Sequence, residues 1–133
     1  MHQYIDQLQK LIQKVEQTQE ENIKAAAALI AATIRNGGVL HVFASGHSHM
    51  LMEEIFYRAG GLVPVNPIFE PSLMLHHGAA KSSSFERVEG IAGTILGQVE
   101  TKPGEPIIII SNSGINAVPV EMAKEAGALG MKV

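Results

Sequence analysis

One stretch decides the fold: PIIIISNSGIN, residues 106–116. The four isoleucines Ile107–Ile110 leave no polar face, which is typical of a strand covered by helices on both sides. The tight turn Ser111–Asn116 follows this strand. Ala117–Ala126 then has a helical pattern with Pro119 in its first turn, where the missing N–H costs little. Strand, turn and helix in this order predict a right-handed unit of a parallel sheet.

The same order of elements occurs earlier in the chain. Val39–Ala44 is a short apolar run typical of a buried strand, and the turn Ser45–Ser48 and a helix from about His49 to Ala59 follow it. Leu62–Val65 is predicted as a second strand and Phe85–Gln98 as a further helix. The segment between them is predicted to be irregular, and loops of this length are usually functional. It spans Ile68–Ser84.

The N-terminal segment is predicted to be helical. His2–Asn36 contains no proline or glycine, and its apolar residues recur at steps of three and four. The polar stretch Glu16–Asn22 is a candidate break between two helices. We therefore expect a helical segment at 1–36 and an α/β domain at 37–133. The expected fold is a three-layer αβα sandwich with a parallel, flavodoxin-like or Rossmann-like sheet.

The end of the sequence resembles the start of another strand. Met131-Lys132-Val133 follows a glycine turn and has the pattern of a buried strand opening. We therefore expect this chain to be the N-terminal part of a longer protein, truncated after the third or fourth strand. The alternative is a complete short domain that finishes its sheet through a partner chain.

Composition narrows the function classes. The chain has 133 residues, a formal charge of −3 and 46% hydrophobic residues, which suits one domain with a real core. Its few Lys and Arg residues are scattered, so no nucleic-acid partner is expected. The absence of cysteine excludes disulfides and thiolate metal sites. Ala25–Ile34 is too short to span a bilayer, which needs about 20 apolar residues, so we expect no membrane partner and a cytoplasmic location.

Both serine-rich turns are candidate phosphate sites. Each lies between a buried strand and a helix start, where unpaired N–H groups and the helix dipole favour an anion. Neither Ser45–His49 nor Ser111–Asn116 contains Lys or Arg, so neutral donors would hold the phosphate. The alternative is that the serines only cap the helices. The occurrence of two such turns favours the anion site.

The second turn and its helix resemble the SIS (sugar isomerase) family. That family has an apolar strand, then Ser-x-Ser-Gly-x-Thr/Ser, then a helix closing on Ala-Lys-x-x-Gly-Ala, and the chain matches with Ser111–Asn116 and Ala123–Ala128. The family's first loop, Gly-x-Ser, is matched by Gly46-His47-Ser48. The resemblance runs from about Gly38 to Val133, and the second loop is its most diagnostic part.

The resemblance implies a sugar phosphate as small-molecule ligand, no cofactor and a homo-oligomer, either a dimer or a tetramer. The phosphate ligands it implies are Ser48, Ser111 and Ser113. Four further residues complete the two loops: Ser45, Gly46, Asn112 and Gly114. Asn116 stands where the family usually has Thr or Ser, and its amide can still donate or cap the helix. The implied function is a sugar-phosphate isomerase similar to phosphoheptose isomerase. The alternative is a regulatory SIS module that senses a phosphosugar without chemistry.

An aldose–ketose isomerase needs a base and an acid near the sugar. Our candidates are Glu53 on the helix after the first loop, Glu70 after the second strand, His47 and His76. Arabinose-5-phosphate isomerases of the SIS family have a Pro, Glu and His cluster that Pro67, Glu70 and His76 resemble, and a lysine where His47 stands. By contrast, Glu54 is placed to pair with Arg58 on the surface, and His41 is expected to be a satisfied core histidine.

Rival motifs fit less well. Gly46-His47-Ser48-His49-Met50 approaches the nucleophile elbow of α/β-hydrolases, but Met50 replaces its second glycine. The dinucleotide fingerprint and the Walker loop are both absent. His47 and His49, and likewise the adjacent pair His76 and His77, are not spaced one helical turn apart, so no metal site is expected.

Overall fold

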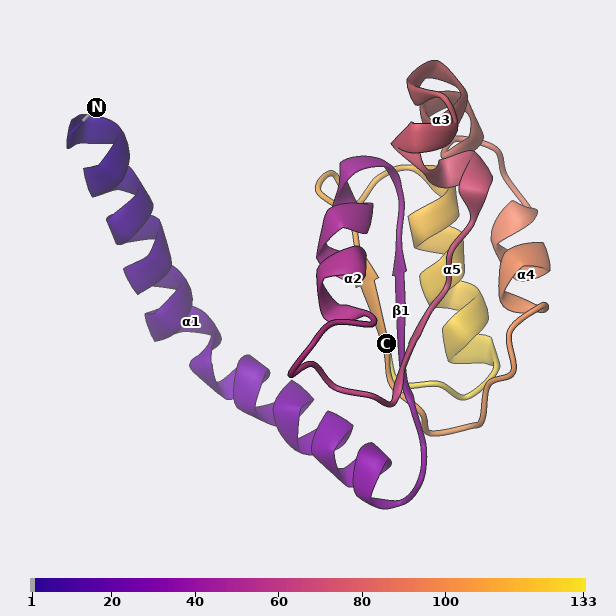
Figure 1. The fold of residues 1–133 in the computed structure, drawn as a ribbon, viewed down its shortest axis with the longest axis horizontal. Coiled ribbons are helices and arrows are strands. Elements are labelled where there is room, and N and C mark those ends of the chain that lie inside the picture. The colour runs from indigo at the N-terminus through magenta and orange to yellow at the C-terminus, as the bar shows by residue number, and fades with distance from the viewer. Residues whose placement is uncertain (1) are drawn as a thin grey trace. The chain divides into compact units, whose positions relative to one another are not determined.

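The computed structural model describes residues 2–133 (Figure 1). The chain divides into two compact units, the first ending at Ala32 and the second spanning Thr33–Val133. Within residues 2–133, no helix is both long enough and apolar enough to cross a bilayer.

The N-terminal segment is one helix, α1, from His2 to Arg35. The expected break at Glu16–Asn22 is absent. Gln and Glu are good helix formers, and Lys24 pairs with Glu20 one turn before it at 2.8 Å. Gly37, with a φ of 75°, takes the left-handed conformation just after the helix end.

The second unit contains a three-stranded parallel sheet in the order β2-β1-β3. The central strand β1 spans Leu40–Ala44, and β2 (Val65–Pro67) and β3 (Ile107–Ile110) flank it. In this register His41 lies opposite Asn66 on one side and Ile107 on the other. The predicted α/β fold with a parallel sheet is confirmed.

Helices lie on both faces of this sheet, but the prediction that Ile107–Ile110 is covered on both sides is wrong for Ile108, which is exposed. Figure 1 shows α2 (His49–Ile55) on one face and α4 (Ile91–Leu96) with α5 (Ala117–Ala128) on the other. A further helix, α3 (Ala79–Phe85), lies beyond the carboxyl end of β1. The buried core between sheet and helices includes Phe43, Ile68, Leu73, Leu96, Ile107, Val118 and Met122.

Several boundaries differ from the sequence prediction. Helix α2 ends at Ile55, four residues before the expected end, because Phe56 is extended and Tyr57 has a left-handed φ of 49°. The second strand begins only at Val65, which is the residue paired with Leu40, the first residue of β1.

The segment between β2 and β3 also differs. The part expected to be irregular holds two 3₁₀ turns, η2 (Pro71–Leu73) and η3 (Leu75–His77), and helix α3. The helix expected at Phe85–Gln98 is interrupted: Phe85 is the last residue of α3, Gly90 adopts a φ of 83°, and the chain is helical again only at Ile91–Leu96.

The last residues run beside β3. Pro106 and Lys132 form an isolated parallel bridge, in which Ile107 N donates to Lys132 O at 2.8 Å and Lys132 N donates to Glu105 O at 3.0 Å. The expected fourth strand is therefore present as a single bridge.

Candidate functional site

The two serine-rich loops meet where the chain connections diverge. β1 and β3 are hydrogen-bonded neighbours, yet β1 leads to α2 on one face and β3 leads to α5 on the other (Figure 1). In open α/β sheets, ligands bind in the crevice that such a divergence leaves at the carboxyl ends of the strands. The loops Ser45–Ser48 and Ser111–Asn116 lie at these ends.

The second loop is shaped by Ser111 and Gly114. Gly114 N donates to Ser111 Oγ at 3.0 Å, and Gly114 has a φ of 66°, a conformation that other residues adopt at a cost. Asn116 precedes α5 in an extended conformation and makes no side-chain capping bond. Capping therefore does not occupy its amide, and the N-terminus of a 12-residue helix faces the loop.

The first loop is a 3₁₀ turn, η1, spanning Gly46–Ser48. Gly46 has a φ of 55°, and Ser48 N donates to Ser45 O at 3.1 Å. Ser45 is buried, and its hydroxyl donates to Glu86 Oε1 at 2.7 Å. The Ser45 hydroxyl is thus already engaged, whereas no side-chain bond holds Ser48 within the described residues.

A cavity of about 420 Å³ lies between the two loops. This volume is within the usual range for small-molecule sites. Its lining includes no Lys or Arg, and its titratable side chains are those of His47 and Glu86. The lining residues are Ser45, Gly46, His47, Ser48, Leu75, Ala79, Ser82, Ser83, Glu86, Ser111, Asn112, Ser113 and Asn116.

The structure brings one of the four catalytic candidates, His47, to this cavity. Glu70 does not line it; its carboxylate accepts from Ser72 N at 2.9 Å and so caps η2. Glu53 and His76 are exposed and also lie outside the lining. The expected surface pair between Glu54 and Arg58 is confirmed.

Glu86 is the residue that sequence reasoning missed. It follows the last residue of α3 and lines the cavity. No motif marks it, because it is placed by a contact with Ser45, 41 residues earlier in the chain. The triple serine before it was a weak signal: Ser82 and Ser83 line the cavity.

His49 is buried behind the first loop, at the start of α2. Its Nδ1 lies 3.1 Å from Gly46 O, so Nδ1 donates, and its Nε2 has no hydrogen-bond partner in the described residues. Burial lowers the pKa of His49 below its ordinary value of 6.5, and the charge of His76 adds to this. The bond to Gly46 and the carboxylates of Glu53 and Glu86 oppose the shift without cancelling it. His49 thus supports the loop as a neutral imidazole.

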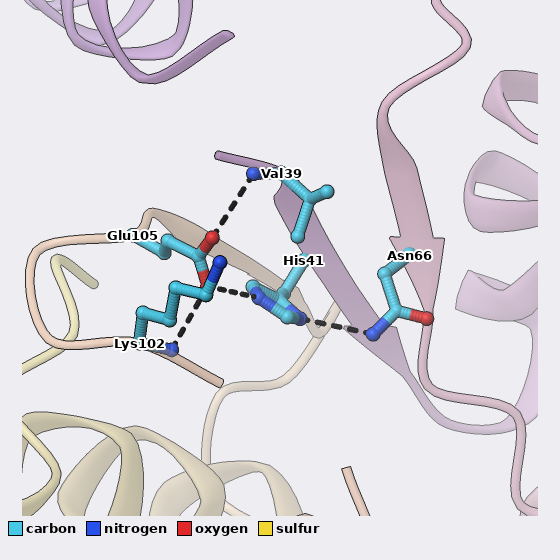
Figure 2. A network of polar contacts seen from close by, with 5 residues as sticks. All are labelled: Val39, His41, Asn66, Lys102 and Glu105. Atoms are coloured by element: carbon cyan, nitrogen blue, oxygen red, sulfur yellow. Dashed lines mark hydrogen bonds and ion pairs between the residues drawn. The ribbon is translucent and has the colours of Figure 1, made fainter. Parts of the chain in front are cut away.

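A buried polar network occupies the opposite end of the sheet (Figure 2). His41 Nε2 donates to Glu105 Oε2 at 3.1 Å, and Asn66 Nδ2 lies 3.1 Å from His41 Nδ1. The Glu105 carboxylate also accepts from Val39 N at 3.1 Å and Lys102 N at 2.9 Å. His41 is therefore a satisfied core histidine, as expected.

These donors stabilise the ionised carboxylate of Glu105. Burial acts to raise the pKa of Glu105, but the bonds from His41, Val39 and Lys102 outweigh it and keep the pKa below its ordinary value of 4.5. A larger cavity of about 490 Å³ borders this network. Because the protein itself satisfies the carboxylate, we assign a structural role to this network and keep the cavity at the other end of the sheet as the candidate site.

Within residues 2–133, no three His, Asp or Glu side chains converge in a way that could hold a metal ion.

Comparison with known proteins decides the family. A family model described as the SIS domain matches residues 3–133. The chain belongs to the SIS domain family. The match covers the α1 segment as well as the α/β unit, so the SIS domain extends further toward the N-terminus than the resemblance at Gly38–Val133 indicated.

Similar curated proteins carry the name UPF0309. One from Thermoanaerobacter pseudethanolicus is 50% identical over 133 residues, which is 98% of this chain and 54% of the relative. One from Caldanaerobacter subterraneus is 51% identical over 131 residues, and one from Geobacillus kaustophilus is 42% identical over 131 residues. These two alignments include 98% and 96% of this chain, and 53% and 52% of the respective relatives. The chain thus spans about half the length of the curated relatives it matches.

Proposed function

We propose that this SIS domain binds a sugar phosphate in the 420 Å³ cavity, with the phosphate against Ser48, Ser111 and Ser113. One observation carries the proposal: two serine-rich loops at the carboxyl ends of neighbouring strands open on a single cavity at the point where the connections diverge. Membership of the SIS family supports the same ligand class.

Neutral donors would hold the phosphate. The lining offers serine hydroxyls and the amides of Asn112 and Asn116, and the helix dipole of α5 adds positive potential at its first turn. Because no Lys or Arg lines the cavity, recognition depends on hydrogen-bond geometry more than on net charge.

The proposed reaction is an aldose–ketose isomerisation similar to that of phosphoheptose isomerase. His47 lines the cavity, and in this proposal it would move protons there. A second function, phosphosugar sensing without chemistry, is favoured by the positions of Glu53, Glu70 and His76 outside the lining. Turnover of a sugar-phosphate panel by the full-length protein separates the two, since binding without turnover supports the sensor.

We also propose a cytoplasmic homo-oligomer, a dimer or a tetramer. The apolar stripe of α1, formed by Ile5, Leu8, Ile12 and Val15, would pack on a partner subunit. A monomer in light scattering of the full-length protein contradicts this part of the proposal.

The binding proposal is tested by replacing Ser111 and Ser113 together with alanine. Hydrogen bonds to charged groups contribute about 1.5–3 kcal/mol each, so the double variant should bind sedoheptulose 7-phosphate at least about 100-fold more weakly in calorimetry. Ser84→Ala is the matched control, because the Ser84 hydroxyl donates to Ala80 O outside the cavity. Unchanged affinity in the double variant contradicts the site.

A further inference from the structure

Glu86 brings the one carboxylate to the cavity lining. Its position is fixed from two further elements. Ser45 Oγ, at the end of β1, donates to Glu86 Oε1 at 2.7 Å, and Val118 N, in the first turn of α5, donates to Glu86 O at 3.1 Å. Glu86 therefore connects the end of α3 to the first loop, after β1, and to the start of α5. A group held in this way from several elements is preorganised for one task.

The Glu86 carboxylate is also a suitable proton acceptor. It is half-buried, and a hydroxyl bonds to one of its oxygens. This bond occupies Oε1 as an acceptor and fixes the orientation of the carboxyl group. Within residues 2–133, no other hydrogen bond to the Glu86 side chain is found, so Oε2 is left for a ligand.

We propose that Glu86 is the base that takes the proton from the carbon beside the sugar carbonyl; this inference rests on the proposed function. The C–H electron pair forms the C=C bond of an enediol, and the carbonyl π electrons move to oxygen, which takes a proton relayed by His47. The neighbouring hydroxyl then returns a proton to His47 while Glu86 protonates the other carbon. Glu86 ends as a carboxylate, and aldose and ketose are interconverted without any net change in protons.

Charge sets the orientation of the substrate in this proposal. A phosphate beside Glu86 would be repelled, and no Lys or Arg lines the cavity to offset this. The phosphate therefore binds at the Ser111–Asn116 loop and the α5 N-terminus, and the sugar carbons extend toward Glu86. It follows that removing the charge of Glu86 should leave phosphate binding equal or stronger.

The test is Glu86→Gln in the full-length protein, because glutamine keeps the size of the side chain and can still accept from Ser45. Two quantities are measured for fructose 6-phosphate, arabinose 5-phosphate and sedoheptulose 7-phosphate. The first is affinity by calorimetry. The second is deuterium uptake from D₂O at the carbon beside the carbonyl, by proton NMR. Glu89→Gln is the matched control, since it makes the same charge change on an exposed carboxylate outside the cavity.

The expected result is that Glu86→Gln binds as tightly as the parent or more tightly, while deuterium uptake falls by about 10²–10⁴-fold, the usual contribution of a general base. The Glu89→Gln control should exchange like the parent. Uptake in Glu86→Gln at the parent rate overturns the assignment of the base and leaves the binding proposal standing. Binding by the parent without any uptake also overturns it and supports the sensor. A parent that binds none of the three ligands overturns the proposed function itself.

Discussion

Replacing Glu105 with glutamine should destabilise the protein strongly, although the side chain barely changes in size. Glu105 Oε1 accepts from Val39 N, and Oε2 accepts from His41 Nε2 and Lys102 N. Glutamine has a single acceptor oxygen. In either orientation its NH₂ group faces at least one buried or half-buried donor, which loses its partner.

The magnitude follows from these three bonds. A buried donor without an acceptor costs about 1–3 kcal/mol, and each remaining bond loses about 1 kcal/mol because its acceptor is no longer charged. We therefore expect Glu105→Gln to lower the free energy of unfolding by about 3 kcal/mol. Urea denaturation of the full-length protein at pH 7 measures this, and the exposed Glu100→Gln serves as control, with a change within about 0.5 kcal/mol.

The pH dependence gives the same prediction a second readout. Because the pKa of Glu105 lies below its ordinary value of 4.5, its contribution is present in full above that value and is lost as the pH falls through the lowered pKa. The difference in the free energy of unfolding between the parent and Glu105→Gln should therefore become smaller as the pH falls. A variant as stable as the Glu100→Gln control at pH 7, or a gap that stays constant to low pH, refutes the reasoning.

Two further predictions concern the loops. Gly114→Ala should weaken sugar-phosphate binding several-fold in calorimetry and lower the free energy of unfolding by about 1 kcal/mol in urea denaturation. The cause is conformational, because Gly114 has a φ of 66° and no atom lies within 4 Å of the added Cβ. Unaltered binding and stability would contradict this prediction. His49 is buried, and its pKa in the folded protein is lowered from 6.5. As the pH falls, the unfolded chain therefore protonates this histidine before the folded protein does, and the free energy of unfolding should decrease below pH 6.5. Denaturation at a series of pH values should show this loss in the parent and a flatter profile in His49→Gln, whereas identical profiles would count against the shift.

The sequence predicts the parts of the fold that local pattern determines. The run Ile107–Ile110 has no polar face and proved to be a strand, and the turn after it lies at the carboxyl end of the sheet. His41 was expected in the core because it lies within an apolar strand, and it is buried there with two partners.

The parts that tertiary contacts determine could not be predicted. Helix α3 is stabilised by a buried hydrogen bond in which Ser82 Oγ donates to Leu73 O at 2.8 Å. The hydrophobic pattern of the sequence does not predict a contact of this kind. The break at Gly90 depends on its left-handed backbone, which is one of several conformations open to glycine. Glu86 enters the site through a bond to Ser45 that joins distant parts of the chain, so its role is visible only in the fold.

The central claim is that one cavity between the two serine loops holds a sugar phosphate. The most direct measurement is a crystal structure of the full-length protein soaked with sedoheptulose 7-phosphate. Our account predicts phosphate density within hydrogen-bond distance of Ser48, Ser111 and Ser113, with the sugar extending toward Glu86. Phosphate bound elsewhere while this cavity stays empty would contradict it.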